Sequence, residues 1–132
     1  MTGVDTNVLV RYLTQDEPRQ ARRATRFFEE LAGHGGRCML DPVVLCELVW
    51  VLHGAYGLER DLIADTIDRL LNASQIEVDR RDVVQAAAAQ YRRGPGDFAD
   101  YVIGESHRRS GCETTVTFDR RLAKASGFRL LA

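Results

Sequence analysis

The feature that most constrains how this chain can fold is an alternation of short apolar segments with longer amphipathic ones, joined by short connections. The short segments have the length of β-strands, and the longer ones repeat apolar residues at helical spacing. Alternation of this kind predicts an α/β domain with a parallel sheet and helices on both faces. Strands are predicted within residues 2–5, 37–40, 75–79, 113–118 and 128–132, and helices within 6–13, 16–33, 41–57, 58–74, 80–94, 97–111 and 119–127. No linker or repeat interrupts the pattern, so we expect one domain over residues 1–132.

Several helix boundaries can be predicted from capping residues. Asp16 is expected to cap the second helix with Pro18 in its first turn, and Asp41 to cap the third with Pro42 at its first position. Asp97 is expected to begin the helix that precedes the strand at 113–118. The inner face of the third helix is expected to be the apolar stripe Val44, Leu48, Val51, Leu52 and Ala55.

Composition narrows the class of protein. With 45% hydrophobic residues the chain can form a core, and no apolar run approaches the roughly 20 residues of a membrane helix. The start of the chain lacks the basic and apolar regions of a signal peptide. Three cysteines without a C-x-x-C spacing are expected to be reduced or to lie in the core, which favours a cytoplasmic protein.

Acidic residues gather where such a sheet would hold its working site, beyond the carboxyl ends of the strands. Asp5 ends the first strand, and Asp119 directly follows the strand at 113–118. Glu47 is expected on the shoulder of the apolar stripe of its helix. Asp100 is expected at the edge of an inner stripe made by Ala99, Val102, Ile103 and Ser106. A carboxylate at the boundary of a core needs a partner.

Each of these acids also has a structural explanation. Asp5, Asp97 and Asp119 are well placed to cap the helices that follow them, and Asp100 stands in capping-box position to Asp97. Glu47 could pair with a buried arginine. Taken together, however, several carboxylates at one sheet edge would repel one another, and a divalent cation with oxygen ligands, Mg²⁺ or Mn²⁺, removes that repulsion.

Other kinds of site are poorly supported. The three histidines are scattered, which argues against zinc, and neither a Walker loop nor a G-x-G-x-x-G motif is present. A site in which carboxylates hold Mg²⁺ or Mn²⁺ often transfers phosphoryl groups. Seventeen of the eighteen basic residues are arginine, a side chain that suits phosphate but is also common on solvated helix faces.

Four motifs in this order resemble the PIN domain, and within it bacterial toxins of the VapC type. They are "VDTNVLVRYL", "VVLCELVWVL", "DFADYVIGESHRRSGCETTVTFD" and the closing "FRLL", which together extend over essentially the whole chain. The resemblance implies a three-layer α/β/α sandwich around a central, mostly parallel sheet of four to five strands. It also implies an endoribonuclease that depends on Mg²⁺ or Mn²⁺.

The resemblance assigns roles to individual residues. The acidic positions of the family motifs match Asp5, Glu47, Asp100 and Asp119, which the resemblance makes catalytic metal ligands. Asp97 matches an additional acid of the motif and ranks below Asp100 as a candidate. Supporting polar positions match Thr6, Asn7 and Thr117. Toxins of this kind usually form dimers, pair with a small DNA-binding antitoxin (VapB-like) and cut structured RNA such as tRNA or ribosomal RNA loops.

The predicted mechanism is attack of a metal-activated water on the phosphodiester, which leaves 5′-phosphate and 3′-hydroxyl ends. Arginines near the rim are expected to hold the RNA backbone, and their positions suggest Arg11, Arg92, Arg93 and Arg120. Two alternatives within the fold are a PIN nuclease of RNA processing outside a toxin–antitoxin pair and an inactive binding module. A phosphoaspartate enzyme is disfavoured because Asn7 stands where its second aspartate would be.

Overall fold

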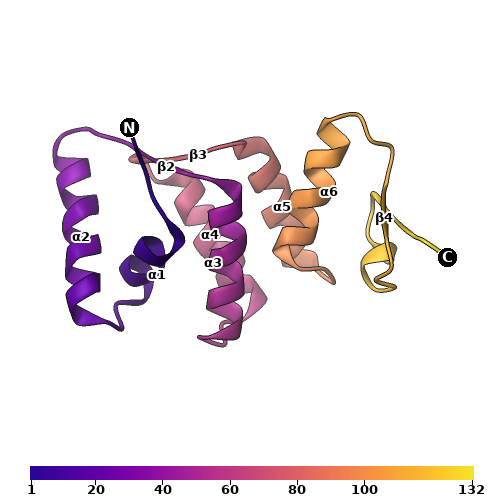
Figure 1. Cartoon of the computed structure of the whole chain (residues 1–132), viewed down its shortest axis with the longest axis horizontal. Helices are drawn as coiled ribbons and strands as arrows, with labels where there is room; N and C mark the ends of the chain where they lie inside the picture. The colour runs from indigo at the N-terminus through magenta and orange to yellow at the C-terminus, as the bar shows by residue number, and fades with distance from the viewer. The chain divides into compact units, whose positions relative to one another are not determined.

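The computed structural model describes all residues, 1–132, and divides into two compact units, Met1–Arg81 and Asp82–Ala132. Each unit is described by itself (Figure 1). The elements of the first unit are β1 (Thr2–Gly3), α1 (Thr6–Thr14), α2 (Pro18–Gly33), β2 (Cys38–Leu40), α3 (Pro42–Gly54), α4 (Arg60–Asn72) and β3 (Ile76–Val78). The later elements are α5 (Arg81–Arg93), α6 (Phe98–Arg109), β4 (Thr115–Thr117), the 3₁₀ helix η1 (Leu122–Lys124) and β5 (Phe128–Leu130).

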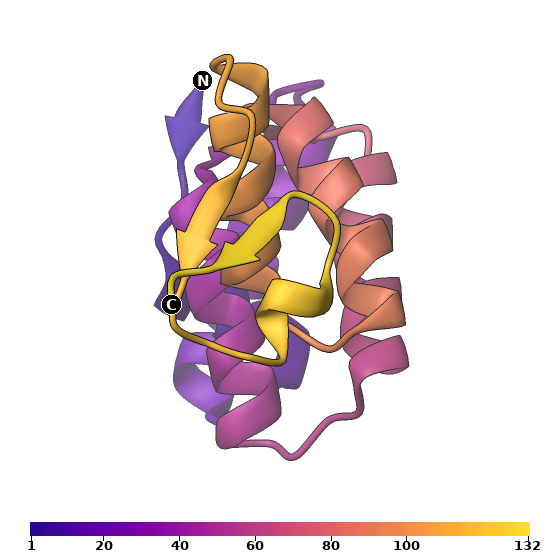
Figure 2. The ribbon, with the colours of Figure 1, turned by 90° about the vertical axis from the view of Figure 1, so that its right-hand side faces the viewer.

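All strand pairs are parallel, as predicted. In the first unit the strands lie in the order β1-β2-β3, with Gly3 opposite Met39 and Leu40 opposite Val78. In the second unit β4 pairs with β5, with Thr117 opposite Leu130, and Figure 2 shows this pair together with η1 at the yellow end of the chain. The predicted α/β class with parallel strands is therefore confirmed. The helix predicted within residues 119–127 is only the three-residue 3₁₀ helix η1.

The first unit is held together by an apolar core to which its helices and sheet contribute. Figure 1 shows α1 beside α2, and α1 also packs against α3. The fully buried aliphatic side chains of this unit include Leu9, Leu40, Leu45, Leu48, Ile63 and Ile67. Burying a leucine or isoleucine in this way contributes about 1.5–3 kcal/mol. This packing fixes the strand-to-helix junctions from which the predicted acids project.

Two capping predictions hold and one is wrong. Asp41 caps α3, because its Oδ1 accepts from the Val43 N–H at 2.7 Å, and Pro42 begins the helix. Asp97 stands at the start of α6, as predicted. The α2 helix is capped by Glu17 rather than by Asp16. Asp16 instead accepts hydrogen bonds from the side chains of Tyr56 and Thr14, and these bonds lower its pKa.

Two predicted inner faces also differ from the structure. The buried side of α3 is made by Pro42, Leu45, Cys46, Leu48, Val49 and Leu52, whereas Val44 and Val51 are only half-buried and Ala55 is exposed. In α6 the buried residues are Phe98, Tyr101, Val102 and Glu105, and Ile103 is exposed. Both helices have apolar residues on more than one side, so helical spacing alone does not determine which side packs.

The three cysteines are free. Cys38 and Cys46 lie in the core, as predicted, whereas Cys112 is exposed. Burial raises the pKa of Cys46 to about 11, helped by the charges of Asp41 and Glu47. A thiol with so high a pKa is unreactive at neutral pH. None of the helices is long and apolar enough to cross a membrane.

Glu105 is a buried carboxylate that stabilises the second unit through its partners. It accepts hydrogen bonds from Gln90 at 2.7 Å and from Arg108 at 2.8 Å, and Arg109 lies 3.5 Å away. Burial alone would raise its pKa. The bonds from Arg108 and Gln90 and the two arginine charges outweigh burial and lower it.

A glutamate with a lowered pKa stabilises the folded protein above its unfolded value of 4.5 and loses that effect as the pH falls through the folded pKa. We therefore expect Glu105→Gln to lower the melting temperature at pH 7. The loss should be about 1 kcal/mol, because Arg108 and Arg109 remain partly exposed. Thermal unfolding of both proteins at pH 7 and pH 3 tests this. The gap between the two melting temperatures should be smaller at pH 3 than at pH 7, and an equal gap at both values would contradict this role of Glu105.

Candidate active site

In the first unit Thr6 joins the carboxylates of Asp5 and Glu47. Asp5 is the last residue of the segment between β1 and α1. It caps α1, because its Oδ1 accepts a hydrogen bond from the Thr6 backbone N–H at 2.7 Å. The Thr6 hydroxyl donates to Glu47 Oε1 at 2.6 Å, across 41 positions of sequence. Thr6 thus holds one oxygen of each carboxylate. Asp5 Oδ2 and Glu47 Oε2 accept no hydrogen bond from the protein.

The position of Glu47 corrects one expectation. It does not lie on the shoulder of a buried stripe, since its side chain is exposed on the side of α3 opposite Leu45 and Val49. The predicted need for a partner is nevertheless met by Thr6, not by a buried arginine. Glu47 is therefore available to a ligand on the outer surface of α3.

In the second unit the carboxylates of Asp97 and Asp100 are joined at the start of α6. They form a capping box, in which the Asp97 backbone N–H donates to Asp100 Oδ2 at 2.9 Å. Asp100 is half-buried. Burial raises its pKa, and the negative charges of Asp97 and Asp119 raise it further against the effect of the Asp97 hydrogen bond.

Asp119 follows β4, as predicted, and orders the turn into η1. Its Oδ1 accepts from the backbone N–H groups of Arg121 at 2.9 Å and Leu122 at 3.2 Å. Its own N–H donates to Thr117 Oγ1 at 3.0 Å, so Thr117 positions Asp119. No arginine or lysine forms an ion pair with Asp97, Asp100 or Asp119.

The predicted site residues therefore fall into two groups, Asp5 and Glu47 in the first unit and Asp97, Asp100 and Asp119 in the second. Neither unit by itself arranges three or more carboxylate, imidazole or thiolate groups as a metal-binding cluster. The capping roles expected for Asp5, Asp97 and Asp119 are present in the structure. They leave other carboxylate oxygens available.

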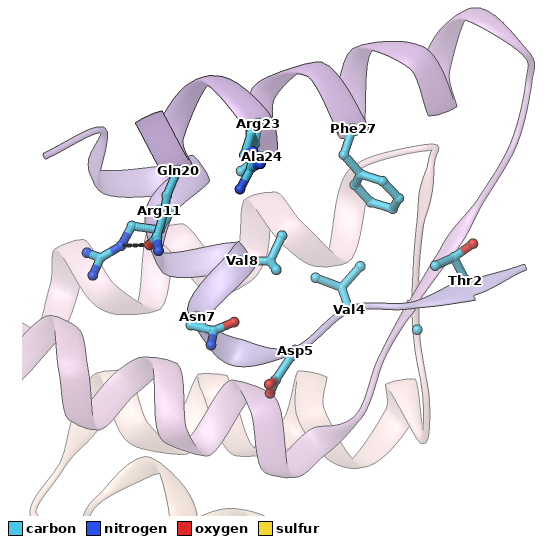
Figure 3. A pocket seen from close by; sticks show the side chains of 11 residues that line it. Thr2, Val4, Asp5, Asn7, Val8, Arg11, Gln20, Arg23, Ala24 and Phe27 are labelled. Carbon is cyan, nitrogen blue, oxygen red and sulfur yellow. Dashed lines mark hydrogen bonds between the residues drawn. The ribbon is translucent and has the colours of Figure 1, made fainter. Parts of the chain in front are cut away.

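The remaining predicted residues have different surroundings. Asn7 is exposed and lines a cleft beside Asp5 (Figure 3). Arg11 is held by Gln20 Oε1 at 2.8 Å and Asp16 at 3.3 Å. Arg92 is half-buried, whereas Arg93 and Arg120 are exposed. Arg92 and Arg93 both lie in the last turn of α5.

Sequence reasoning missed two features. One is the buried Glu105 with its arginine partners, which could have been suspected from the spacing of Glu105, Arg108 and Arg109 on one helix. The other is that four arginines of the run "RQARRATR" share one exposed face of α2.

Comparisons with known proteins identify the family of this chain. The family model described as "PIN domain" matches residues 4–127. A "VapC ribonuclease" of Aquifex aeolicus (strain VF5) is 30% identical over 129 residues, which cover 98% of this chain and 94% of that protein. The matched range includes both carboxylate groups. This chain therefore belongs to the PIN domain family and, within it, to the VapC-type ribonucleases, as its four motifs predicted.

Proposed function

We propose that this VapC-type ribonuclease hydrolyses RNA with the help of a divalent cation, Mg²⁺ or Mn²⁺, and that Asp5, Glu47, Asp100 and Asp119, with Asp97 as an additional acid, are its metal ligands. The observation that carries the proposal is the link through Thr6, which holds the Asp5 and Glu47 carboxylates from two different helices at 2.7 and 2.6 Å. Helix capping explains the bond to Asp5 but gives no reason for the bond to Glu47.

The donor set fits a hard cation. Asp5 and Glu47 each keep one oxygen free of protein hydrogen bonds. Asp100 lies within the field of Asp97 and Asp119, and no basic side chain pairs with any of the three. Oxygen ligands without imidazole or thiolate suit Mg²⁺ or Mn²⁺. When bound, such a cation supplies an activated water and polarises the phosphodiester.

The protein's own residues supply orientation. Thr6 fixes Asp5 and Glu47, the capping box fixes Asp97 and Asp100, and Thr117 fixes the turn that carries Asp119. Because water and not the ribose 2′-hydroxyl attacks, we expect 5′-phosphate and 3′-hydroxyl ends. Arginines at the rim would hold the RNA backbone, and the candidates are Arg11, Arg92, Arg93 and Arg120.

We propose further that the substrate is structured RNA, such as a tRNA or ribosomal RNA loop, and that the chain is the toxin of a toxin–antitoxin pair. The support is the similarity to the Aquifex VapC ribonuclease over nearly the whole of both chains. The pair would include a small DNA-binding, VapB-like antitoxin, and the toxin would act as a homodimer in the cytoplasm.

Cleavage of total tRNA and ribosomal RNA tests the reaction. We expect discrete cuts with 5′-phosphate ends, full inhibition by EDTA and recovery on adding Mg²⁺ or Mn²⁺ in excess. Sequencing of adaptor-ligated fragments, with and without prior phosphorylation, maps the cuts and identifies the ends. Cuts that persist in EDTA and carry 2′,3′-cyclic phosphate would show that the 2′-hydroxyl is the nucleophile, contrary to the proposal.

Expression in bacteria tests the toxin role separately. We expect growth to stop within one to a few doublings after induction of the wild-type chain, and Asp5→Asn to restore growth at equal protein level. Colony counts and immunoblots measure both. Normal growth with abundant, folded and RNA-cleaving protein would place the chain among PIN nucleases outside toxin–antitoxin pairs.

A further inference from the structure

The outer face of α2 carries four exposed arginines. At 3.6 residues per turn their Cα atoms fall within an arc of about 100°, opposite the face by which α2 packs. That packing face is made by Ala21, Ala24 and Phe28. The four arginines, called here the α2 arginine stripe, are Arg19, Arg22, Arg23 and Arg26.

The α2 arginine stripe forms no ion pair, and Glu29 and Glu30 are the acidic residues that follow it on the same helix. None of its four guanidinium groups forms an ion pair or a side-chain hydrogen bond, in contrast to Arg11, Arg37, Arg108 and Arg109. The whole chain has a net charge of −1, so this concentration of positive charge is local. A stripe of four cationic side chains that are not held in ion pairs attracts polyanions.

The stripe borders a cleft of about 520 Å³ between β1, α1 and α2, to which Arg23 contributes. The middle of the cleft is apolar, and Figure 3 shows Phe27 of α2 pointing toward Val4 and Val8. Asp5 and Asn7 lie along the same cleft. Its volume falls in the range of roughly 300–1,000 Å³ that is typical of small-molecule sites.

We propose that this face of α2 binds the RNA strand that flanks the scissile bond. The α2 arginine stripe holds successive phosphates, and the cleft beside Phe27 takes one unpaired base. Neighbouring arginines three or four positions apart are about 5–6 Å apart at Cβ, a spacing that their long side chains can adjust to a phosphate backbone. This inference rests on the proposed ribonuclease function.

The combination of the two features favours RNA over an acidic peptide. A planar guanidinium binds two phosphate oxygens at once, and an aromatic-walled slot accepts a flat base. A nucleic acid strand presents phosphates and flat bases in regular alternation along its length, which matches a row of arginines beside an aromatic-walled slot. The cleft also continues to Asp5, which places the bound strand beside a predicted catalytic residue.

Binding is measured by fluorescence anisotropy of a labelled twelve-residue oligouridine, in an Asp5→Asn background that blocks cleavage. The variant R19Q/R22Q/R23Q/R26Q should bind the oligouridine about 10–100-fold more weakly at 100 mM salt. The slope of its plot of log Kd against log salt concentration should be lower by about 2–3. A matched control, R37Q/R80Q/K124Q/R129Q, removes the same charge from other elements and should change Kd by less than about threefold.

Phe27→Leu tests the base slot, because leucine keeps the cleft wall apolar without the ring. We expect it to weaken oligouridine binding at least about fivefold while leaving an abasic strand of equal charge unaffected. Circular dichroism melting checks that each variant is folded.

Three outcomes would overturn the inference. The first is a stripe variant with the same Kd and salt slope as the control. The second is equal binding of polyglutamate and oligouridine to the stripe, which would indicate that the stripe binds an acidic protein. The third is Asp5-dependent RNA cleavage with an unchanged KM in the stripe variant. Absence of any Asp5-dependent cleavage by the otherwise unaltered chain would instead overturn the proposed function.

Discussion

Replacing Asp5 with asparagine is expected to abolish RNA cleavage while leaving the fold intact. Loss of one carboxylate charge from a divalent-cation site removes several kcal/mol of transition-state stabilisation, which corresponds to a rate loss on the order of a thousandfold. Asparagine caps helices as well as aspartate does, and its Oδ1 can accept the same Thr6 N–H bond. The melting temperature should therefore be unchanged or slightly raised.

Asp41→Asn is the matched control for this prediction. Asp41 also follows a parallel strand and caps a helix, through its 2.7 Å bond from the Val43 N–H. It lies outside the predicted catalytic set, so its substitution should change the cleavage rate by less than about threefold. Single-turnover cleavage of one mapped RNA compares the proteins. Wild-type rates in Asp5→Asn would show that Asp5 is only a helix cap.

Asp100→Asn is expected to produce a comparable loss of cleavage, about a thousandfold, although Asp100 lies in the other unit. The exposed acid Asp82, in the first turn of α5, provides the control, and Asp82→Asn should cleave normally. Asp97→Asn should have a smaller effect than Asp100→Asn, since Asp97 matches only an additional acid of the motif and ranks below Asp100 as a candidate ligand. Full activity in Asp100→Asn would restrict the working site to the first unit.

The stability of Asp100→Asn provides an independent check. Burial and the charges of Asp97 and Asp119 raise the pKa of Asp100, so its charged form destabilises the folded protein above that pKa. The asparagine side chain of the variant can still accept the Asp97 N–H bond. We expect a higher melting temperature than wild type at pH 7 and no difference below the unfolded pKa of 3.8, where both side chains are neutral.

The sequence predicted the elements of this fold well because their signals are local. Strands such as β2 and β3 are short segments with buried apolar residues, and Asp5, Asp41 and Asp97 stand at helix starts with the geometry that capping requires. The sequence predicts Asp16 as the N-cap of α2, one residue before the actual cap, Glu17. Asp16 has the right chemistry, but its carboxylate is taken by Tyr56, 40 positions away, and a contact of that range has no local signal.

The faces of α3 and α6 could not be predicted from periodicity. In "VVLCELVWVL" nearly every position is apolar, so spacing does not define one inner side, and Glu47 lies opposite the buried Leu45. In α6 the charged Glu105 is buried because Gln90 and two arginines satisfy it. Burial in both helices depends on partners elsewhere in the chain, which spacing does not reveal.

The candidate site was predictable as a list of residues but not as a set of contacts. The motifs identified the acids, and the family is confirmed over residues 4–127. That Thr6 links Asp5 to Glu47, and that Asp100 bonds to the Asp97 backbone, required the structure. The catalytic roles of these residues are proposals, and those two links support them.

Manganese binding is the most direct test that Asp5 and Asp100 are metal ligands. Electron paramagnetic resonance of free Mn²⁺ gives the dissociation constant for the wild type, Asp5→Asn, Asp100→Asn and the Asp41→Asn control. We predict that Asp5→Asn and Asp100→Asn each weaken binding at least about tenfold, while Asp41→Asn binds like the wild type. Wild-type Mn²⁺ affinity in either Asp5→Asn or Asp100→Asn would contradict the role of that residue as a metal ligand.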